Sequence, residues 1–265
     1  MPPLILIIEH NAGFFSCCSV FLFLVIDFFN KNKRLPDGVD SSRQFDLYKP
    51  VDSPTRNVTF DFFDFRDYYR FPYEKDIVFS YQDQFTNYKN IDFQNVVPFV
   101  EKYLSPSREV SSIIETMENK YNLTKEFYED LCVLFYRGND KSTEVALCNY
   151  EEIVEKAKEI AENHPGVHFL IQSDETEFIE TMKKEFPNNI CFEDEIRHMP
   201  RDPQGTVDNL DKSKNYEYAK KFLAITIIMS KAKHVIFPSG NCSLWITLYR
   251  GNAENTHQFL NNEWL

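Results

Sequence analysis

The sequence predicts an α/β fold whose second half contains a parallel, Rossmann-like sheet. From Leu131 onward, short apolar runs alternate with longer segments in which apolar residues recur at helical spacing. Charged and turn-forming residues follow the first of these runs, as is typical of the ligand-binding edge of open α/β sheets. The predicted strands are 131–136, 167–172, 189–192 and 234–237, and the predicted helices between them are 149–163, 176–186 and 214–230.

The chain opens with a further strand–turn–helix unit. Residues 4–8 are a continuous aliphatic run, residues 10–13 form a turn that ends in a glycine, and residues 14–30 form an apolar helix. A lone glycine most often marks only a tight turn, so it is a weak phosphate-loop signal. We expect this unit to begin an N-terminal half.

The apolar N-terminus can imitate a signal or membrane anchor. Met1 is not followed by basic residues, Glu9 and His10 interrupt the apolar stretch, and Asp27 lies within its second run. That run is shorter than the roughly 20 residues that a membrane span needs. We therefore expect a buried strand and helix and no transmembrane segment.

Residues 37–76 are predicted to be irregular, because Asp, Pro, Ser and aromatic residues dominate them. Within this stretch, Phe alternates with Asp over residues 60–65, which indicates a short edge strand or a surface loop with anchoring rings. The many aspartates suggest a metal site, but a solvated charged loop is the commoner outcome. We expect no metal here.

The middle of the chain is predicted to hold the boundary between the halves. A strand at 77–81 is followed by a helical stretch at 96–119 that is broken at 105–107, and Pro106 is expected to begin the new helix. We place the N-terminal half at 1–110 and the C-terminal half at 111–265. The hydrophilic loop 193–213 is long enough to close over a ligand.

Charge and cysteine usage exclude some functions. A net charge of −12 argues against a nucleic-acid-binding surface, because phosphate contacts need clustered Lys and Arg. The six cysteines include no CxxC pair and no His at metal-ligand spacing, so a zinc site is not expected. Cys132 and Cys191 lie in or beside apolar runs and fit small buried hydrophobes in a reducing compartment. We expect a cytoplasmic location.

The segment Arg137-Gly-Asn-Asp-Lys-Ser-Thr-Glu144 places several charges in one β-to-α connection. It follows the predicted strand 131–136, and Asn149 is a plausible N-cap of the next helix. A cation for phosphate and a carboxylate for proton transfer can meet at such a sheet edge.

This segment resembles the Arg-x-x-Asp-Lys-…-Thr-Glu motif of the α1,6-fucosyltransferases and nodulation fucosyltransferases, relatives of the protein O-fucosyltransferases. The resemblance covers roughly residues 131–250, with weaker support from 1–35. It implies a GT-B glycosyltransferase in which two Rossmann-like halves face a central cleft. It also implies a nucleotide-sugar donor, a glycan acceptor and no cofactor or catalytic metal.

Arg137 is the strongest single candidate for the site. An Arg at the end of a strand can form two hydrogen bonds with a diphosphate and stabilise the leaving nucleotide. The resemblance implies the same role. The alternative is a structural ion pair with Asp140 or Asp174. The family's second Arg is replaced here by Gly138.

The resemblance makes Glu144 the general base that takes the acceptor proton, if its surroundings bring its pKa toward neutrality. Lys141 would tune this carboxylate or hold the acceptor. The family motif usually has one more residue between its Lys and its Thr-Glu pair, so Glu144 is equally well an exposed loop carboxylate. Asp140 is the next candidate for the general base.

Two later segments also match the family in order. Asp174 follows the strand 167–172 and is expected to bind Arg137 or ribose hydroxyls, or else to cap the following helix. The loop after the strand 234–237 can hold phosphate on backbone N–H groups and hydroxyls. Ile225 stands where the family carries a nucleotide-associated Asp. The donor-site candidates in the loop are Ser239, Gly240, Asn241 and Ser243.

The family also opens with a strand, a Gly-containing loop and a helix, which makes His10, Asn11 and Gly13 candidates for lining the cleft. The leading hypothesis is a metal-independent, inverting glycosyltransferase with GDP-fucose as donor. Because Gly138 and Ile225 depart from the pattern, UDP-xylose or another nucleotide sugar is an alternative. A binding module without catalytic activity is the contrasting hypothesis.

Overall fold

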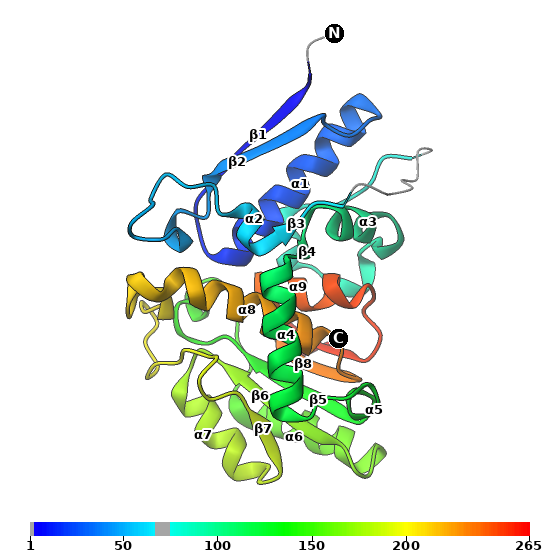
Figure 1. Ribbon diagram of the computed structural model, residues 1–265. Coiled ribbons are helices and arrows are strands. Elements are labelled where there is room, and N and C mark those ends of the chain that lie inside the picture. The colour runs from blue at the N-terminus through cyan, green and yellow to red at the C-terminus, as the bar shows by residue number, and fades with distance from the viewer. Residues whose placement is uncertain (1–2, 67–74) are drawn as a thin grey trace.

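The computed structural model describes residues 3–66 and 75–265, and the chain forms two α/β parts over these residues (Figure 1). The larger part contains a six-stranded sheet with the order β10-β9-β8-β5-β6-β7. All neighbouring strands in it are parallel except β9 and β10. Its strands are β5 Leu131–Tyr136, β6 His168–Ser173, β7 Asn189–Cys191, β8 His234–Pro238, β9 Thr256–Leu260 and β10 Glu263–Trp264.

The predicted strands and helices of this part are confirmed. Every residue of β5 is buried, which explains why its sequence is a continuous apolar run. Asn149 caps α6 through a capping box with Glu152, as the sequence indicated. The helices are α6 Tyr150–Asn163, α7 Thr176–Glu185, α8 Asn215–Ser230 and α9 Asn241–Arg250. Strands β9 and β10 were not predicted.

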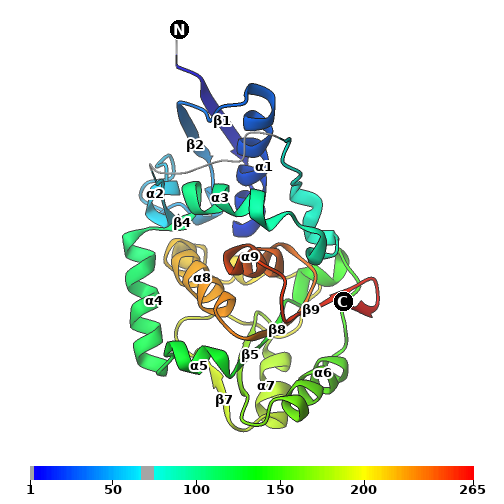
Figure 2. The ribbon, with the colours of Figure 1, turned by 90° about the vertical axis from the view of Figure 1, so that its right-hand side faces the viewer.

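The helices cover the two faces of this sheet in pairs (Figure 2). Tyr136 of β5 stacks on Phe178 of α7, with 4.8 Å between ring centroids, and also meets Tyr150 of α6 edge-on. α8 and α9 lie on the other face, between the sheet and the N-terminal part.

The N-terminal part is built on a two-stranded parallel sheet of β1 (Ile5–His10) and β2 (Gly38–Gln44), joined by α1 (Phe14–Asn32). The opening strand and helix are therefore confirmed. The prediction that 37–76 is irregular is wrong for β2, whose mostly polar residues gave no strand signal.

The Phe-Asp stretch forms a short helix and a short strand, α2 (Thr59–Phe62) and β3 (Phe63–Asp64). Phe62 and Phe63 are fully buried whereas Phe60 is 52% exposed, so the stretch anchors itself through some of its rings. The remainder of this aromatic stretch, at 67–74, lies outside the described residues.

Two predictions for the middle of the chain are wrong. Residues 77–80 are not a strand, because the N–H of Ile77 donates to the Asn30 side chain and a 3₁₀ helix begins at Tyr81. Pro106 does not begin a helix. It lies in β4 (Ser105–Pro106), paired with β3, and Ser107 caps α4 by accepting from the Val110 N–H. The helices here are α3 Phe93–Tyr103, α4 Arg108–Tyr121 and α5 Lys125–Glu129.

Helix α1 is long and apolar enough to span a membrane by length and composition. In the fold it acts as a core helix. Phe15 stacks on Trp245 of α9 at 5.9 Å, and the Trp245 indole N–H donates to Ser19. The absence of a transmembrane segment remains a prediction. The boundary between the two halves at residue 110 also remains a prediction. This residue lies in the first turn of α4.

Candidate functional site

A cavity of about 260 Å³ lies at the C-terminal ends of β5, β6 and β8. Its size is close to the lower end of small-molecule sites, roughly 300–1,000 Å³. The start of α1 lines it from the N-terminal part. The loop after β5, the end of β6, the loop 193–213, α8 and the start of α9 complete it. This edge is where open α/β sheets bind ligands.

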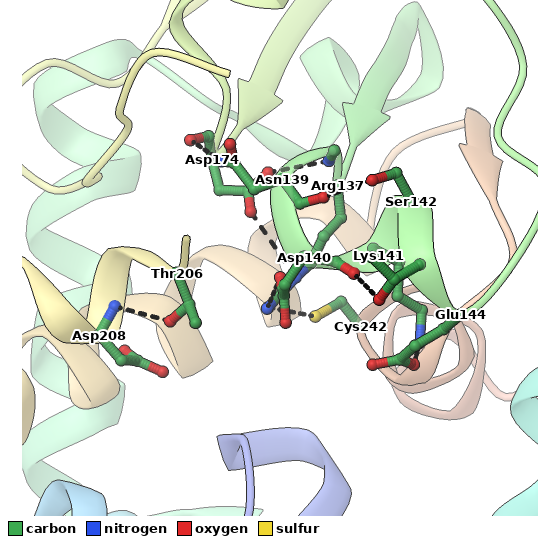
Figure 3. Close-up of polar contacts among 12 residues, drawn as sticks. Arg137, Asn139, Asp140, Lys141, Ser142, Glu144, Asp174, Thr206, Asp208 and Cys242 are labelled. Carbon is green, nitrogen blue, oxygen red and sulfur yellow. Dashed lines mark hydrogen bonds and ion pairs between the residues drawn. The ribbon is translucent and has the colours of Figure 1, made fainter. Parts of the chain in front are cut away.

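Arg137 lines the cavity and is held by two carboxylates (Figure 3). Its Nη2 lies 3.1 Å from Asp140 Oδ1, and its Nε lies 3.7 Å from Asp174 Oδ2. Its Nη1 approaches the Cys242 Sγ at 3.8 Å. The ion pairs of Arg137 with Asp140 and Asp174, which the sequence left as the alternative to a diphosphate contact, are therefore present. They fix a guanidinium that still has 26% of its side-chain surface exposed.

Asp174 is mostly buried, with 11% of its side chain exposed, and it does not cap α7. Its Oδ1 accepts from the Gly138 N–H at 3.1 Å, and Glu175 occupies the N-cap position instead. The capping alternative is therefore wrong. Burial raises the pKa of Asp174, and the neighbouring Arg137 guanidinium opposes that rise. The carboxylate serves to orient Arg137 and the loop that carries it.

Lys141 and Glu144 form an ion pair at the other end of the same loop. The Lys141 ammonium is buried and also donates to Gln84 Oε1, 3.2 Å away. The Glu144 carboxylate has 47% of its surface exposed and lines the cavity. An acceptor hydroxyl can therefore reach Glu144 from solvent, while Lys141 stays fixed behind it.

Asn139 ties this loop to two neighbouring segments. Its amide donates to the Asp174 carbonyl at 2.8 Å and accepts from the Asp202 N–H at 2.9 Å. The Asp140 N–H donates to the Gly205 carbonyl at 3.3 Å. The loop 193–213 is thus bound to the loop after β5, and its closure over a ligand remains a prediction.

Gly138 is required by a close approach of Glu175. A Cβ at position 138 would lie 2.2 Å from Glu175 Oε2, and Glu175 is completely buried. Burial raises the pKa of Glu175, while Tyr150 and the Arg201 guanidinium, 3.1 Å away, oppose the rise. A side chain at position 138, such as the family's second Arg, would therefore require the Glu175 carboxylate to move.

The loop after β8 presents its backbone to the cavity. Helix α9 begins at Asn241, and no side chain of the described residues caps it. The N–H groups of Asn241, Cys242 and Ser243 therefore have no acceptor within the helix. These three residues, with Ser239 and Gly240, line the cavity. An anion is favoured at such a helix N-terminus.

The side chains of this loop have structural partners. Ser239 Oγ donates to the Phe259 carbonyl at 2.8 Å, and Ser243 Oγ donates to the Pro238 carbonyl at 2.5 Å. Asn241 Oδ1 accepts from Ser19 Oγ at 2.8 Å. The Ser239 and Ser243 hydroxyls, expected to donate to phosphate, already donate to the main chain.

The turn after β1 reaches the cavity only in part. Gly13 is in the cavity wall, but His10 and Asn11 are not. His10 Nε2 lies 3.0 Å from Ser16 Oγ, and the Asn11 amide donates to the Arg43 carbonyl at 2.9 Å. The structure thus corrects the expectation that all three residues line the cleft.

Several residues of the wall were missed from the sequence. The Tyr48 hydroxyl donates to Asp208 at 2.7 Å, and Arg197 pairs with Asp208 at 2.7 Å. They lie in irregular segments that give no spacing signal. Gln172 did give a sequence signal, because it is an amide that directly follows the apolar run 169–171.

No group of three or more His, Cys, Asp or Glu in residues 3–66 and 75–265 is arranged to hold a metal ion. All six cysteines are free. Burial raises the pKa of the Cys242 thiol, although Arg137 and Lys141 oppose the shift.

The two parts and the cavity between them define the GT-B fold. No family model and no curated protein sequence matches the chain. Among solved structures, a NodZ α-1,6-fucosyltransferase soaked with GDP-fucose matches with a TM-score of 0.58 and 9% identity, covering 99% of this chain and 98% of that one.

Two further NodZ structures also match the fold of the chain. Fucosyltransferase NodZ from Bradyrhizobium matches with a TM-score of 0.55 and 11% identity, over 94% of this chain and 93% of that chain. A NodZ α-1,6-fucosyltransferase co-crystallised with GDP matches with a TM-score of 0.54 and 12% identity, over 94% of this chain and 92% of that chain. The resemblance to fucosyltransferases is thus confirmed at the level of the fold.

Proposed function

We propose that this protein is a metal-independent, inverting glycosyltransferase that uses a nucleotide sugar. The observation that carries the proposal is the convergence of Arg137 and the uncapped start of α9 on one cavity. A guanidinium and a row of backbone N–H groups together can hold a diphosphate. They stabilise the negative charge that the diphosphate gains as the glycosyl bond breaks.

Glu144 is the proposed general base. In a single displacement, it takes the proton of an acceptor hydroxyl while the oxygen bonds to the anomeric carbon. The bond from that carbon to the diphosphate breaks, and the nucleoside diphosphate leaves with the bonding electrons. The exposed Glu144 carboxylate can meet an acceptor, and its pairing with Lys141 keeps it oriented.

The first donor to test is GDP-fucose, and a fucosyl group would then pass to a glycan hydroxyl. The motif resemblance suggests this donor, and the structural match to a fucosyltransferase soaked with GDP-fucose supports it. UDP-xylose or another nucleotide sugar is the alternative. Gly138 and Ile225 support it, because both depart from the family's pattern.

Nucleotide binding tests the proposal most directly. We expect GDP or UDP to raise the melting temperature, because a ligand of the native state stabilises it. EDTA should leave the shift unchanged. Arg43, exposed and paired with Glu9 outside the cavity wall, offers a matched control, so Arg43→Ala should bind like the wild type. Binding that disappears with EDTA would contradict metal independence.

Transfer then separates an enzyme from a binding module. A radiolabelled donor should lose its sugar to an oligosaccharide acceptor or, more slowly, to water. Nucleotide binding with neither transfer nor hydrolysis across a panel of donors would favour the module. No nucleotide binding at all would overturn both hypotheses.

A further inference from the structure

Gln172 is a buried amide in the cavity wall with no role in the proposed chemistry. It lies near the end of β6, in register with Phe135 of β5, and only 5% of its surface is exposed. Its Oε1 is buried and has no hydrogen-bond partner among the residues that the structure describes. Buried carbonyl oxygens of this kind usually have a donor, so a ligand is the candidate partner.

The orientation of β5 and β6 places Gln172 on the α8 side of the sheet. Tyr136 packs on Phe178 of α7 and on Tyr150 of α6. Because side chains alternate along a strand, Phe135 and Gln172 point to the opposite face. Ala219, Phe222 and Ile225 of α8 line the cavity with them.

The three α8 residues beside the amide are apolar, and Arg197, which also lines the cavity, is paired with Asp208. Ile225 is 1% exposed. Glu195 lines the same cavity, but its carboxylate already accepts from Lys120 at 2.8 Å and from the Tyr121 hydroxyl at 3.0 Å. The region therefore offers apolar side chains and one amide, that of Gln172, whose Oε1 is buried without a partner among the described residues.

The nucleobase is the part of a nucleotide sugar that fits these groups. A phosphate has no proton to donate to Oε1, and a sugar presents hydroxyls on every side to an apolar wall. A base has apolar faces and an edge with N–H and C=O groups. A base whose edge needs more partners than one amide would leave polar groups buried and unpaired, which is unfavourable.

We propose that the Gln172 amide recognises the base, and that this subsite favours uracil over guanine. The inference rests on the proposed function and decides between its two donors. One amide pairs with one N–H and one C=O of either base. Uracil is then left with an unpaired carbonyl and guanine with an unpaired exocyclic amino group, and a buried N–H without an acceptor is tolerated less well than a carbonyl without a donor.

Calorimetric titration of UDP and GDP tests the inference. The wild type should bind UDP roughly tenfold more tightly than GDP, the scale of one buried hydrogen bond. Gln172→Glu should lower the ratio of UDP to GDP affinity by about tenfold or more, because a carboxylate accepts two N–H groups of guanine and repels the carbonyl of uracil.

Gln84→Glu is the matched control. It adds the same charge to the same cavity, but Gln84 contacts Lys141 rather than the apolar wall. Both nucleotides should weaken alike, so the affinity ratio stays that of the wild type. Tighter binding of GDP than UDP by the wild type, or an unchanged ratio in Gln172→Glu, would overturn the inference.

Two further outcomes are distinguishable. If the wild type binds no nucleoside diphosphate, the proposed function fails and the inference fails with it. If Gln172→Glu does not fold, Gln172→Leu replaces it without adding charge. Gln172→Leu should lose the preference for UDP, and a retained preference counts against the role of Gln172.

Discussion

The loop after β5 and the loop after β8 reach the same cavity but present different chemical groups to it. The first presents side chains, since Arg137, Asp140 and Glu144 all line the cavity. The second presents the backbone, because its Ser239 and Ser243 hydroxyls donate to main-chain carbonyls. Similar polar composition therefore has different consequences in the two loops.

The difference follows from what each loop is connected to. The loop after β5 passes through a short 3₁₀ helix, 139–143, whose Asp140 and Lys141 pair with Arg137 and Glu144 on either side of it. The loop after β8 enters α9 almost at once, and its side chains close the junction with β9 and α1. Substitutions should therefore affect chemistry in the first loop and folding in the second.

The largest effect is expected at Glu144. Glu144→Gln removes the base and keeps its size, so turnover should fall by roughly two to four orders of magnitude. Nucleotide affinity should be nearly unchanged, because the proposed phosphate contacts lie elsewhere. The measurement is transfer from a radiolabelled donor, paired with nucleotide titration. Near-normal turnover would make Asp140 the next carboxylate to test.

Arg137→Ala should weaken both binding and turnover. A charge-assisted contact contributes about 1.5–3 kcal/mol, which is roughly tenfold to over a hundredfold in affinity. Asp140 and Asp174 also lose their shared cation, so the melting temperature is measured alongside the nucleotide titration. Equal nucleotide affinities in the mutant and the wild type would show that the loop after β5 does not hold the diphosphate.

Much of the larger sheet could be predicted because its central strands are buried on both faces. Such strands are continuous apolar runs, as in β5. Strand β2 escaped prediction because it is mostly polar and belongs to a two-stranded sheet. Strand β9 was missed because it is short and carries His257 and Gln258 among its apolar residues.

The site could be predicted only where it follows a strand directly. Arg137 and Asp174 were found because charged residues end apolar runs. Gln84 and Tyr48 come from distant segments of the N-terminal part, and only the folded chain brings them to Lys141 and Asp208. For Ser239 and Ser243 the position was predicted, but the partners of their hydroxyls depend on tertiary contacts.

Gly138→Ala tests the packing of the loop after β5 against Glu175. The new Cβ would lie 2.2 Å from the buried Glu175 carboxylate, and overpacking of this kind costs roughly 1–3 kcal/mol. We expect a lower free energy of unfolding by denaturant titration. Glu175→Ala in the same chain should make the added methyl less costly, which a double-mutant cycle measures. Additive effects would contradict a direct clash.

The smallest effect on binding is expected from Ser243→Ala. The hydroxyl donates to the Pro238 carbonyl, so its removal should lower the free energy of unfolding by about 1 kcal/mol. The Ser243 backbone N–H remains, and nucleotide affinity should change by less than about threefold, under 1 kcal/mol. Denaturant titration and calorimetry measure the two quantities separately. A tenfold loss of affinity with unchanged stability would mean that the hydroxyl turns to the phosphate, and the contrast between the two loops would fail there.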